Sequence, residues 1–352
     1  MKKVFIGIRT YNSEKYLNDC FQSVWEQDYP KMHIVVFDDK SSDGTIDELN
    51  KWKNAFADRG VQFEIVQNSE NGGCGQSFER MGRLVAAKID KDDIFVMLDS
   101  DDKFTSDKTI SNCVFQMEKN KADVLIAGFN LTGDMDLVLN WNAGNDHNTL
   151  SKNLAEIGST TIEQTPNIAQ DADSIGWTKI VRGNVFKRYM QMYPVLSKEM
   201  SVCEDFLSLA QLLLRKNEGQ NASEGVKITG LSEHMYEYTK HAQSSTATVK
   251  ADDFRVIRLG FLQSLQEMVT KNKEQFIGDA EKYVNKFIAT KYKVIRNIID
   301  KKNKSGALEG YTSEDWDMDF STKIDCSKLG IKIPNQDIAP SLCQAIITNK
   351  TK

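Results

Sequence analysis

The first hundred residues alternate short apolar runs with segments of helical periodicity, and this alternation restricts the chain to few folds. The predicted strands are 4–8, 33–37, 63–67 and 94–98, and the predicted helices between them are 13–27, 45–56 and 76–89. Strands that alternate with helices of this length form βαβ units around a mostly parallel sheet. The sequence therefore predicts a Rossmann-like α/β fold, with a mostly parallel sheet flanked by helices.

Polar clusters follow three of the four predicted strands. They are Thr10-Tyr11-Asn12, Asp38-Asp39 and Asp99-Ser100-Asp101-Asp102. In open α/β sheets, ligands bind outside the carboxyl ends of the strands. The three clusters therefore predict a ligand site at one edge of the sheet.

The acidic clusters allow two interpretations. Asp99 and Asp101, at positions i and i+2 after a strand, can share one hard divalent cation. Aspartates also follow strands simply because they suit turns and helix caps. A calcium loop beginning at Asp39 is excluded, because Asn50 occupies the position where an EF-hand requires Glu.

Two further segments also have a functional and a structural interpretation. The glycine-rich stretch 71–75 can cradle a phosphate or form a flexible turn before a helix. Phe78 stands where a dinucleotide-binding motif needs its third glycine, and no P-loop lysine follows. Glu204 and Asp205 open a helical run, where a carboxylate can act as a base or simply stabilise the helix N-terminus.

The second half of the chain differs from the first. Residues 130–172 contain few periodic apolar positions and predict a long irregular loop region. From Asp252 onward the pattern is helical, so we expect a domain over 1–250 and a helical appendage over 251–352. Within the appendage, 271–304 holds ten Lys or Arg and four Asp or Glu residues, a net charge of +6. This segment predicts either a solvated helix face or a surface for an anionic partner.

Composition excludes several classes of protein. The net charge of −5 disfavours a globally basic nucleic-acid binder. No apolar run reaches the roughly 18 residues of a membrane span, so we expect no transmembrane segment. The six cysteines form no C-x-x-C pair, which disfavours a zinc or redox site. We expect a cytoplasmic location, with peripheral attachment at the membrane surface left open.

Seven short segments resemble, in order, the motifs of the family 2 glycosyltransferases, whose fold is called GT-A. They are the strand ending in Thr10-Tyr11-Asn12, the V-F-D-D-K-S-S-D-G-T segment from Val36 to Thr45, Asn71-Gly72-Gly73, Leu98-Asp99-Ser100-Asp101-Asp102, the W-T-K-I segment with Arg182, Glu204-Asp205, and Tyr236-Glu237-Tyr238 with His241, Ser244 and Thr246. The resemblance covers about residues 1–250 and implies an inverting, metal-dependent transferase.

The resemblance also implies roles for individual residues. The nucleotide-sugar donor would be bound by Thr10, Tyr11, Asn12, Asp39, Asn71, Gly73, Asp99, Trp177 and Lys179, the last two from a segment that lies beside the acceptor in the family. Mn²⁺ or Mg²⁺ would be bound by Asp99, Asp101 and His241. Asp205 would be the general base, with Glu204 orienting it or capping the helix.

The expected reaction moves a sugar, most simply from a UDP-sugar, to an acceptor hydroxyl. The expected acceptor is a glycan or lipid-linked glycan, with nucleic acid or another anionic acceptor as alternatives through the basic helix. A sugar nucleotidyltransferase and a non-catalytic nucleotide-sugar binding module remain alternative functions. Arg9 and Lys40 depart from the family pattern, which usually has Pro and Gly there, and leave the identity of the nucleotide open.

Overall fold

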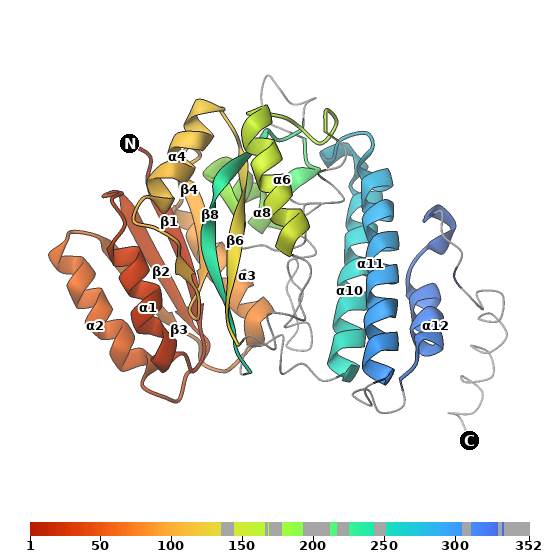
Figure 1. Cartoon of the computed structure of the whole chain (residues 1–352), viewed down its shortest axis with the longest axis horizontal. Helices are drawn as coiled ribbons and strands as arrows, with labels where there is room; N and C mark the ends of the chain where they lie inside the picture. Colours follow the sequence, from red (N-terminus) through yellow and green to blue (C-terminus); the bar gives the residue numbers. More distant parts are fainter. Residues whose placement is uncertain are drawn as a thin grey trace.

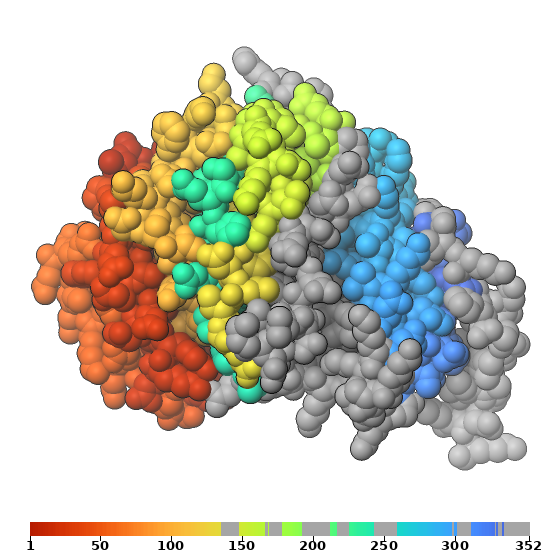
Figure 2. Space-filling view, viewed as in Figure 1, coloured from red at the N-terminus to blue at the C-terminus, as the bar shows by residue number. Residues whose placement is uncertain are grey.

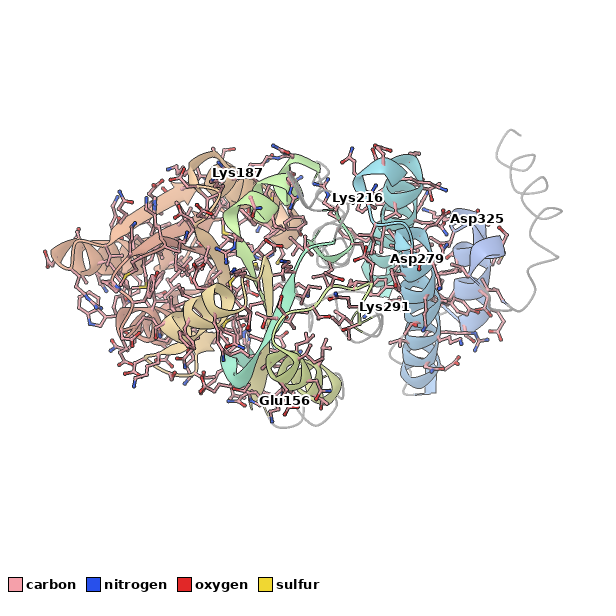
Figure 3. The ribbon with its side chains drawn as sticks, turned by 90° about the horizontal axis from the view of Figure 1, so that it is seen from above. Glu156, Lys187, Lys216, Asp279, Lys291 and Asp325 are labelled. Atoms are coloured by element: carbon pink, nitrogen blue, oxygen red, sulfur yellow. The ribbon has the colours of Figure 1, made fainter. Side chains whose placement is uncertain are left out.

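The protein combines a sheet flanked by helices with a helical C-terminal region (Figure 1). The structure is a computed structural model that describes residues 1–134, 144–165, 168, 178–192, 212–216, 225–242, 251–304, 311–329 and 333. Seen from above, Lys187 and Glu156 lie on opposite sides of the sheet, so helices cover both of its faces (Figure 3). This arrangement confirms the predicted α/β class with a helical C-terminal region.

The N-terminal half contains the predicted alternation of strands and helices. Its elements are β1 (Val4–Thr10), α1 (Glu14–Trp25), β2 (Met32–Asp38), α2 (Thr45–Asp58), β3 (Gln62–Gln67), α3 (Gly73–Lys88), β4 (Ile94–Asp99), β5 (Lys103–Phe104) and α4 (Thr109–Lys119). β2 is buried along its whole length, and β1 and β4 are buried except for one half-buried residue each. Fully buried strands are typical of parallel sheets that are covered on both faces.

The second half of the sheet is more mixed. Its elements are β6 (Val124–Gly133), α6 (Gly144–Ile157), β7 (Lys179–Arg182), α8 (Gly183–Met192) and β8 (Ile228–Lys240). In the described residues the sheet has eight strands in the order β3-β2-β1-β4-β7-β6-β8-β5. The pairs among β1–β4 and the β6–β8 pair are parallel, whereas β7 and β5 run antiparallel to their neighbours.

The prediction of an irregular loop over 130–172 is wrong in part. β6 continues to Gly133, and α6 occupies Gly144–Ile157. The hydroxyl of Ser151 lies within hydrogen-bonding distance of backbone carbonyl oxygens in both β6 and β8, and Asn148 hydrogen-bonds the backbone of Phe129. Because polar side chains make these contacts, α6 has few of the apolar positions by which a helix is recognised in a sequence.

Three long helices form the C-terminal region. They are α10 (Ala251–Lys271), α11 (Ala280–Lys304) and α12 (Ser313–Lys323), with short 3₁₀ turns η6 (Lys273–Gln275) and η7 (Cys326–Lys328). Buried Asp317 joins α12 to α11 by accepting hydrogen bonds from Tyr292 at 2.6 Å and Arg296 at 3.0 Å. Among the described residues, no helix combines the length and apolarity needed to cross a bilayer. The division into two domains at residue 250 stays a prediction.

A short segment, 212–216, connects the helical region to the sheet domain. Its Arg215 donates to the carbonyl of Arg188 in α8 and to the side chain of Gln275 before α11. Its Lys216 accepts from Arg188 and donates to the carbonyl of Glu274. Figure 3 shows Lys216 beside the helices, and in the space-filling view of Figure 2 α11 lies on the side of the molecule away from the N-terminal strands.

Candidate active site

The polar clusters meet at the carboxyl edge of the sheet, as the sequence predicts. β1 lies between β2 and β4, with Thr10 opposite Asp38 and Arg9 opposite Asp99. The turns that follow these strands are therefore neighbours, although up to ninety residues of sequence separate them. The edge brings together hydroxyl, amide and carboxylate groups within one small region.

Asp38 and Asn12 shape the first part of this edge. Asp38 is fully buried and accepts from the hydroxyl of Thr10 at 3.1 Å and from the backbone and hydroxyl of Ser41. Asn12 has a φ of 48°, and its amide oxygen accepts from the backbone of Ser42 at 2.8 Å. Tyr11, which lies between Thr10 and Asn12 in the sequence, is 51% exposed. Thr10 and Asn12 thus hold the turn together, while the Tyr11 ring is left open to a ligand.

Asp39 holds the glycine-rich turn. Its carboxylate accepts from the backbone of Gly72 at 2.9 Å, from the backbone of Gly73 at 2.7 Å and from the amide of Asn68 at 2.9 Å. Asn71 also accepts from the Gly73 backbone, and Gly73 has a left-handed φ of 78°. A carboxylate has about four acceptor positions. Three of these positions are taken by Asn68, Gly72 and Gly73, so the expected contact with a nucleobase would occupy the fourth. That contact stays a prediction.

Arg9 makes contacts that the sequence did not predict. One guanidinium nitrogen donates to the carboxylate of Asp99 at 2.9 Å, and another donates to the carbonyl of Cys74 at 3.0 Å. Arg9 therefore links β1, β4 and the first turn of α3. The only sequence signal was its departure from the family pattern at this position.

The end of β8 is joined to the D-x-D segment by successive contacts. The hydroxyl of Tyr236 accepts from the backbone of Asp99 at 2.7 Å, and the backbone of Thr239 donates to Asp102 at 2.7 Å. His241, just after the strand, approaches Asp101 with Nε2 2.9 Å from Oδ2. β8 thus brings His241 next to Asp101, and the role of both residues as metal ligands stays a prediction.

Burial and mutual repulsion make the negative charge of this site costly to hold without a cation. Burial, followed by the charges of Asp101 and Asp99, raises the pKa of Asp102 well above its usual value. Burial also raises the pKa of the Tyr236 hydroxyl, and the same aspartates add to the effect. Burial lowers the pKa of Lys240 even though Asp102 and Asp101 act in the opposite direction. Clustered carboxylates of this kind favour a bound cation.

Two of the three predicted metal ligands fit a divalent cation. Asp101 and His241 supply one oxygen and one nitrogen donor on the same side of the site, a set that suits Mn²⁺. The ring of Tyr16 stacks on His241 at 4.6 Å between centroids and fixes its plane. Asp99 is instead engaged by Arg9. Within the described residues, no group of three or more His, Cys, Asp or Glu side chains is arranged for a metal.

Several predicted residues are not placed at this edge. Trp177, Glu204 and Asp205 lie outside the described residues. Lys179 is in β7, opposite Ile126 of β6, and is 1% exposed. Their assigned roles in donor binding and catalysis stay predictions.

We expect the Tyr236→Phe variant to lower the free energy of unfolding by about 1–3 kcal/mol, because it leaves the backbone N–H of Asp99 without its acceptor. Urea unfolding measures this loss. Tyr238→Phe is the control, since its half-buried hydroxyl accepts from Lys240 at 3.2 Å on the same strand, and it should change stability by about 0.5 kcal/mol or less. Equal losses in the two variants would contradict the role given to Tyr236.

The sequence matches known proteins over the same region. The profile of the family described as Glycosyl transferase family 2 matches residues 5–176. The poly(ribitol-phosphate) beta-N-acetylglucosaminyltransferase TarS of Staphylococcus aureus (strain MW2) is 26% identical over 286 residues, which cover 79% of this chain and 44% of that protein. The chain thus spans less than half the length of this relative.

Solved structures share the fold. S. aureus TarS 1–349 in complex with UDP-GlcNAc has a TM-score of 0.63 at 19% identity, covering 96% of this chain and 83% of that one. The mannosyltransferase PcManGT from Pyrobaculum calidifontis, in complex with GDP-Man and Mn²⁺, has a TM-score of 0.51 at 15% identity, covering 87% and 76%. The GT-A fold expected from the sequence is confirmed. The chain therefore contains a glycosyl transferase family 2 region, which spans residues 5–176.

Proposed function

We propose that this chain transfers a sugar from a UDP-sugar to an acceptor hydroxyl with inversion at the anomeric carbon. One observation carries the proposal: the Asp101–His241 pair lies at the same sheet edge as the turn held by Asp39. A site for a cation therefore adjoins a site for a nucleoside. The family 2 region and the UDP-GlcNAc bound by the similar TarS structure support the choice of donor.

The donor nucleoside is proposed to lie along the edge formed by the β1 and β2 turns. The exposed ring of Tyr11 would pack against the base, and Asp39 would accept from a base N–H. Thr10, Asn12, Asn71 and Gly73 would keep these two turns in place through the hydrogen bonds described above. The family resemblance adds Trp177 and Lys179 to the proposed donor and acceptor side of the site, which Lys179 would have to reach from its buried position in β7.

The diphosphate is proposed to leave on the side of Asp101 and His241. A divalent cation held by these two residues would supply the positive charge that the leaving diphosphate requires. Arg9, paired with Asp99, would keep that carboxylate oriented beside the ribose. Asp102 and Tyr236 would hold the D-x-D segment and β8 in register.

The acceptor hydroxyl is proposed to lose its proton to Asp205, with Glu204 orienting the base. A base that faces the leaving group across the sugar leads to a single displacement, and hence to inversion. The TarS relative is named for its action on poly(ribitol-phosphate). We propose that this chain uses the same class of acceptor, a glycan of the polyol-phosphate type.

Binding of the donor tests the proposal. We expect UDP-GlcNAc with Mn²⁺ to raise the melting temperature, and a ligand at about 100 times its Kd contributes roughly 2.7 kcal/mol of stability. GDP-mannose with Mn²⁺ is the matched control for the nucleotide. No shift with any nucleotide sugar would contradict the proposal. Release of UDP together with transfer of the sugar distinguishes an enzyme from a binding module. Release of pyrophosphate from a nucleoside triphosphate would instead indicate a nucleotidyltransferase.

A further inference from the structure

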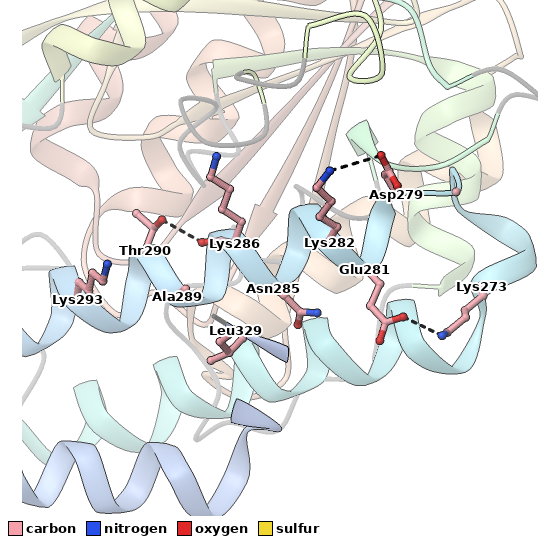
Figure 4. Close-up of a pocket in the computed structure, with 11 residues that line it drawn as sticks. Lys273, Asp279, Glu281, Lys282, Asn285, Lys286, Ala289, Thr290, Lys293 and Leu329 are labelled. Carbon is pink, nitrogen blue, oxygen red and sulfur yellow. Dashed lines mark hydrogen bonds and ion pairs between the residues drawn. The ribbon is translucent and has the colours of Figure 1, made fainter. Parts of the chain in front are cut away.

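A groove of about 850 Å³ runs along the N-terminal half of α11, away from the candidate active site (Figure 4). Three of its lysines, Lys282, Lys286 and Lys293, recur along one face of the helix. Because successive helical residues are about 100° apart, these three fall within an arc of about 40° and along about 17 Å of helix axis. We call this row and its surroundings the lysine groove.

The lysines of the groove are exposed and only partly neutralised. Lys282 is 4.0 Å from Asp279, in a pair whose side chains are 77% and 62% exposed, and such exposed pairs contribute little. Lys286 and Lys293 are exposed, and neither is paired with a carboxylate in the described part of the chain. Figure 4 shows Lys282 and Lys286 on the same side of α11. The groove therefore presents a row of positive charge to solvent.

The floor of the groove is firmly held. Asn285, Ala289 and Leu329 line it and are buried. The oxygen of Asn285 accepts from Gln266 of α10 at 3.1 Å, and Gln266 also exchanges hydrogen bonds with the backbone of Asp325. These contacts tie α10, α11 and the segment after α12 together beneath the lysines. The row of charge thus sits on a rigid base.

The shape of the groove favours a linear polyanion over a membrane surface. A helix that lies on a bilayer inserts an exposed apolar face between the lipids. The two apolar residues that line the groove, Ala289 and Leu329, are each 7% exposed, and the remaining lining residues are polar, charged or glycine. A concave, charged groove without exposed apolar residues fits an extended chain of negative charges.

The groove lies far from the sheet edge where transfer is proposed. β8 and α11 both run from the top to the bottom of the view in Figure 1, so the start of α11 lies at the end of the molecule opposite the carboxyl end of β8. Residues 212–216 anchor that start to α8. A single ligand that reaches both the groove and the active site must therefore be a polymer.

We propose that the lysine groove binds the phosphodiester backbone of a polyanionic acceptor at a distance from the hydroxyl that receives the sugar. The statement that this polyanion is the sugar acceptor rests on the proposed glycosyltransferase function. Binding at two places on one chain raises the effective concentration of the second contact, so long acceptors should bind more tightly than short ones.

The test compares poly(ribitol phosphate) chains of two and about twelve units as acceptors. For wild type we expect the longer chain to have a KM at least about tenfold lower than the dimer. The triple variant Lys282→Glu, Lys286→Glu, Lys293→Glu should raise the KM of the long chain to that of the dimer and leave kcat on the dimer unchanged. Fluorescence anisotropy of the labelled long chain should show a matching loss of at least about tenfold in affinity, and wild-type binding should weaken with salt with a log–log slope of about −2, as for three phosphate contacts.

A charge-matched control is the triple variant Lys53→Glu, Lys91→Glu, Lys119→Glu, because these exposed lysines lie outside the groove. It should behave as wild type. If wild type and the groove variant bind the long chain with equal affinity and both transfer sugar, the proposed role of the lysine groove is contradicted. The proposed glycosyltransferase function is then unaffected. If wild type transfers sugar to neither the dimer nor the long chain but binds the long chain through the groove, only the proposed function is contradicted. Groove-dependent binding to phosphatidylglycerol vesicles without binding to the polymer would assign the groove to a membrane surface and overturn the proposal.

Discussion

The Asp205→Asn variant should bind UDP-sugar as wild type does and lose about 10²–10⁴-fold in turnover. Asparagine has the size and shape of aspartate, but its amide cannot take the proton of the acceptor hydroxyl. Because Asp205 belongs to the acceptor side of the proposed reaction, donor and metal binding should be unaffected. The measurement is kcat with saturating donor and acceptor, together with the thermal shift produced by the donor and Mn²⁺.

Glu204→Gln is the matched control for the base, since it changes a neighbouring carboxylate in the same way. If Glu204 orients the base or caps the helix, its loss should cost far less turnover than the loss of Asp205. The acidic limb of the kcat–pH profile should persist in Glu204→Gln and disappear in Asp205→Asn. Transfer by Asp205→Asn at a rate near that of wild type would show that another group is the base.

The central strands and the edge that carries the site can be predicted from the sequence because each strand is a continuous buried run. β1, β2 and β4 are nearly completely buried, and the parallel connections between them contain helices of ordinary length. Once these strands are recognised, the clusters at Thr10, Asp38 and Asp99 must fall at one edge. The rule that parallel strands share their carboxyl edge then leads from sequence to site.

The contacts that organise the edge are much harder to predict. Tyr236 and Asp99 are 137 residues apart, and the position of β8 beside β5 decides that they meet. The hydrogen bonds of Asp39 to Gly72 and Gly73 depend in the same way on the relative placement of two turns. A sequence pattern can identify such residues as polar and suited to turns, but not as partners. The charge of Arg9 indicates that it needs a partner, yet Asp99 becomes that partner only through the β1–β4 register.

α11 can be predicted from the sequence and α6 cannot, because α6 packs on the sheet through small and polar residues. α11 buries a long apolar stripe that includes Val284, Ile288 and Ile295, so helical spacing is visible in its sequence. α6 lies on β8 so closely that a side chain at Gly230 would meet the backbone of Ser151 at 2.0 Å. Small and polar residues make this close approach possible, and they carry no hydrophobic periodicity.

The Asp101→Asn variant should lower the affinity for Mn²⁺, and with it the Mn²⁺-dependent binding of UDP-sugar, by more than about 100-fold. Even residues that only orient a metal ligand contribute about 10–100-fold to metal affinity, so the loss of a ligating carboxylate should exceed that range. Asparagine can still hydrogen-bond to His241, which lies 2.9 Å from Asp101, so the end of β8 should stay in place. Titration of Mn²⁺ followed by electron paramagnetic resonance measures the affinity without relying on turnover.

His241→Gln separates a metal site from a merely structural contact. If His241 is a ligand, its loss should weaken Mn²⁺ binding, because the variant lacks the imidazole nitrogen that would bind the ion. His234→Gln is the control: His234 lies within β8, but its ring is paired with Asn130 away from the D-x-D segment, and its loss should leave Mn²⁺ binding unchanged. Equal Mn²⁺ titrations for wild type, Asp101→Asn and His241→Gln would mean that the pair serves to fasten β8 to the D-x-D segment. The cation would then have to be held elsewhere, because the negative charge of the site alone attracts a cation without fixing its position.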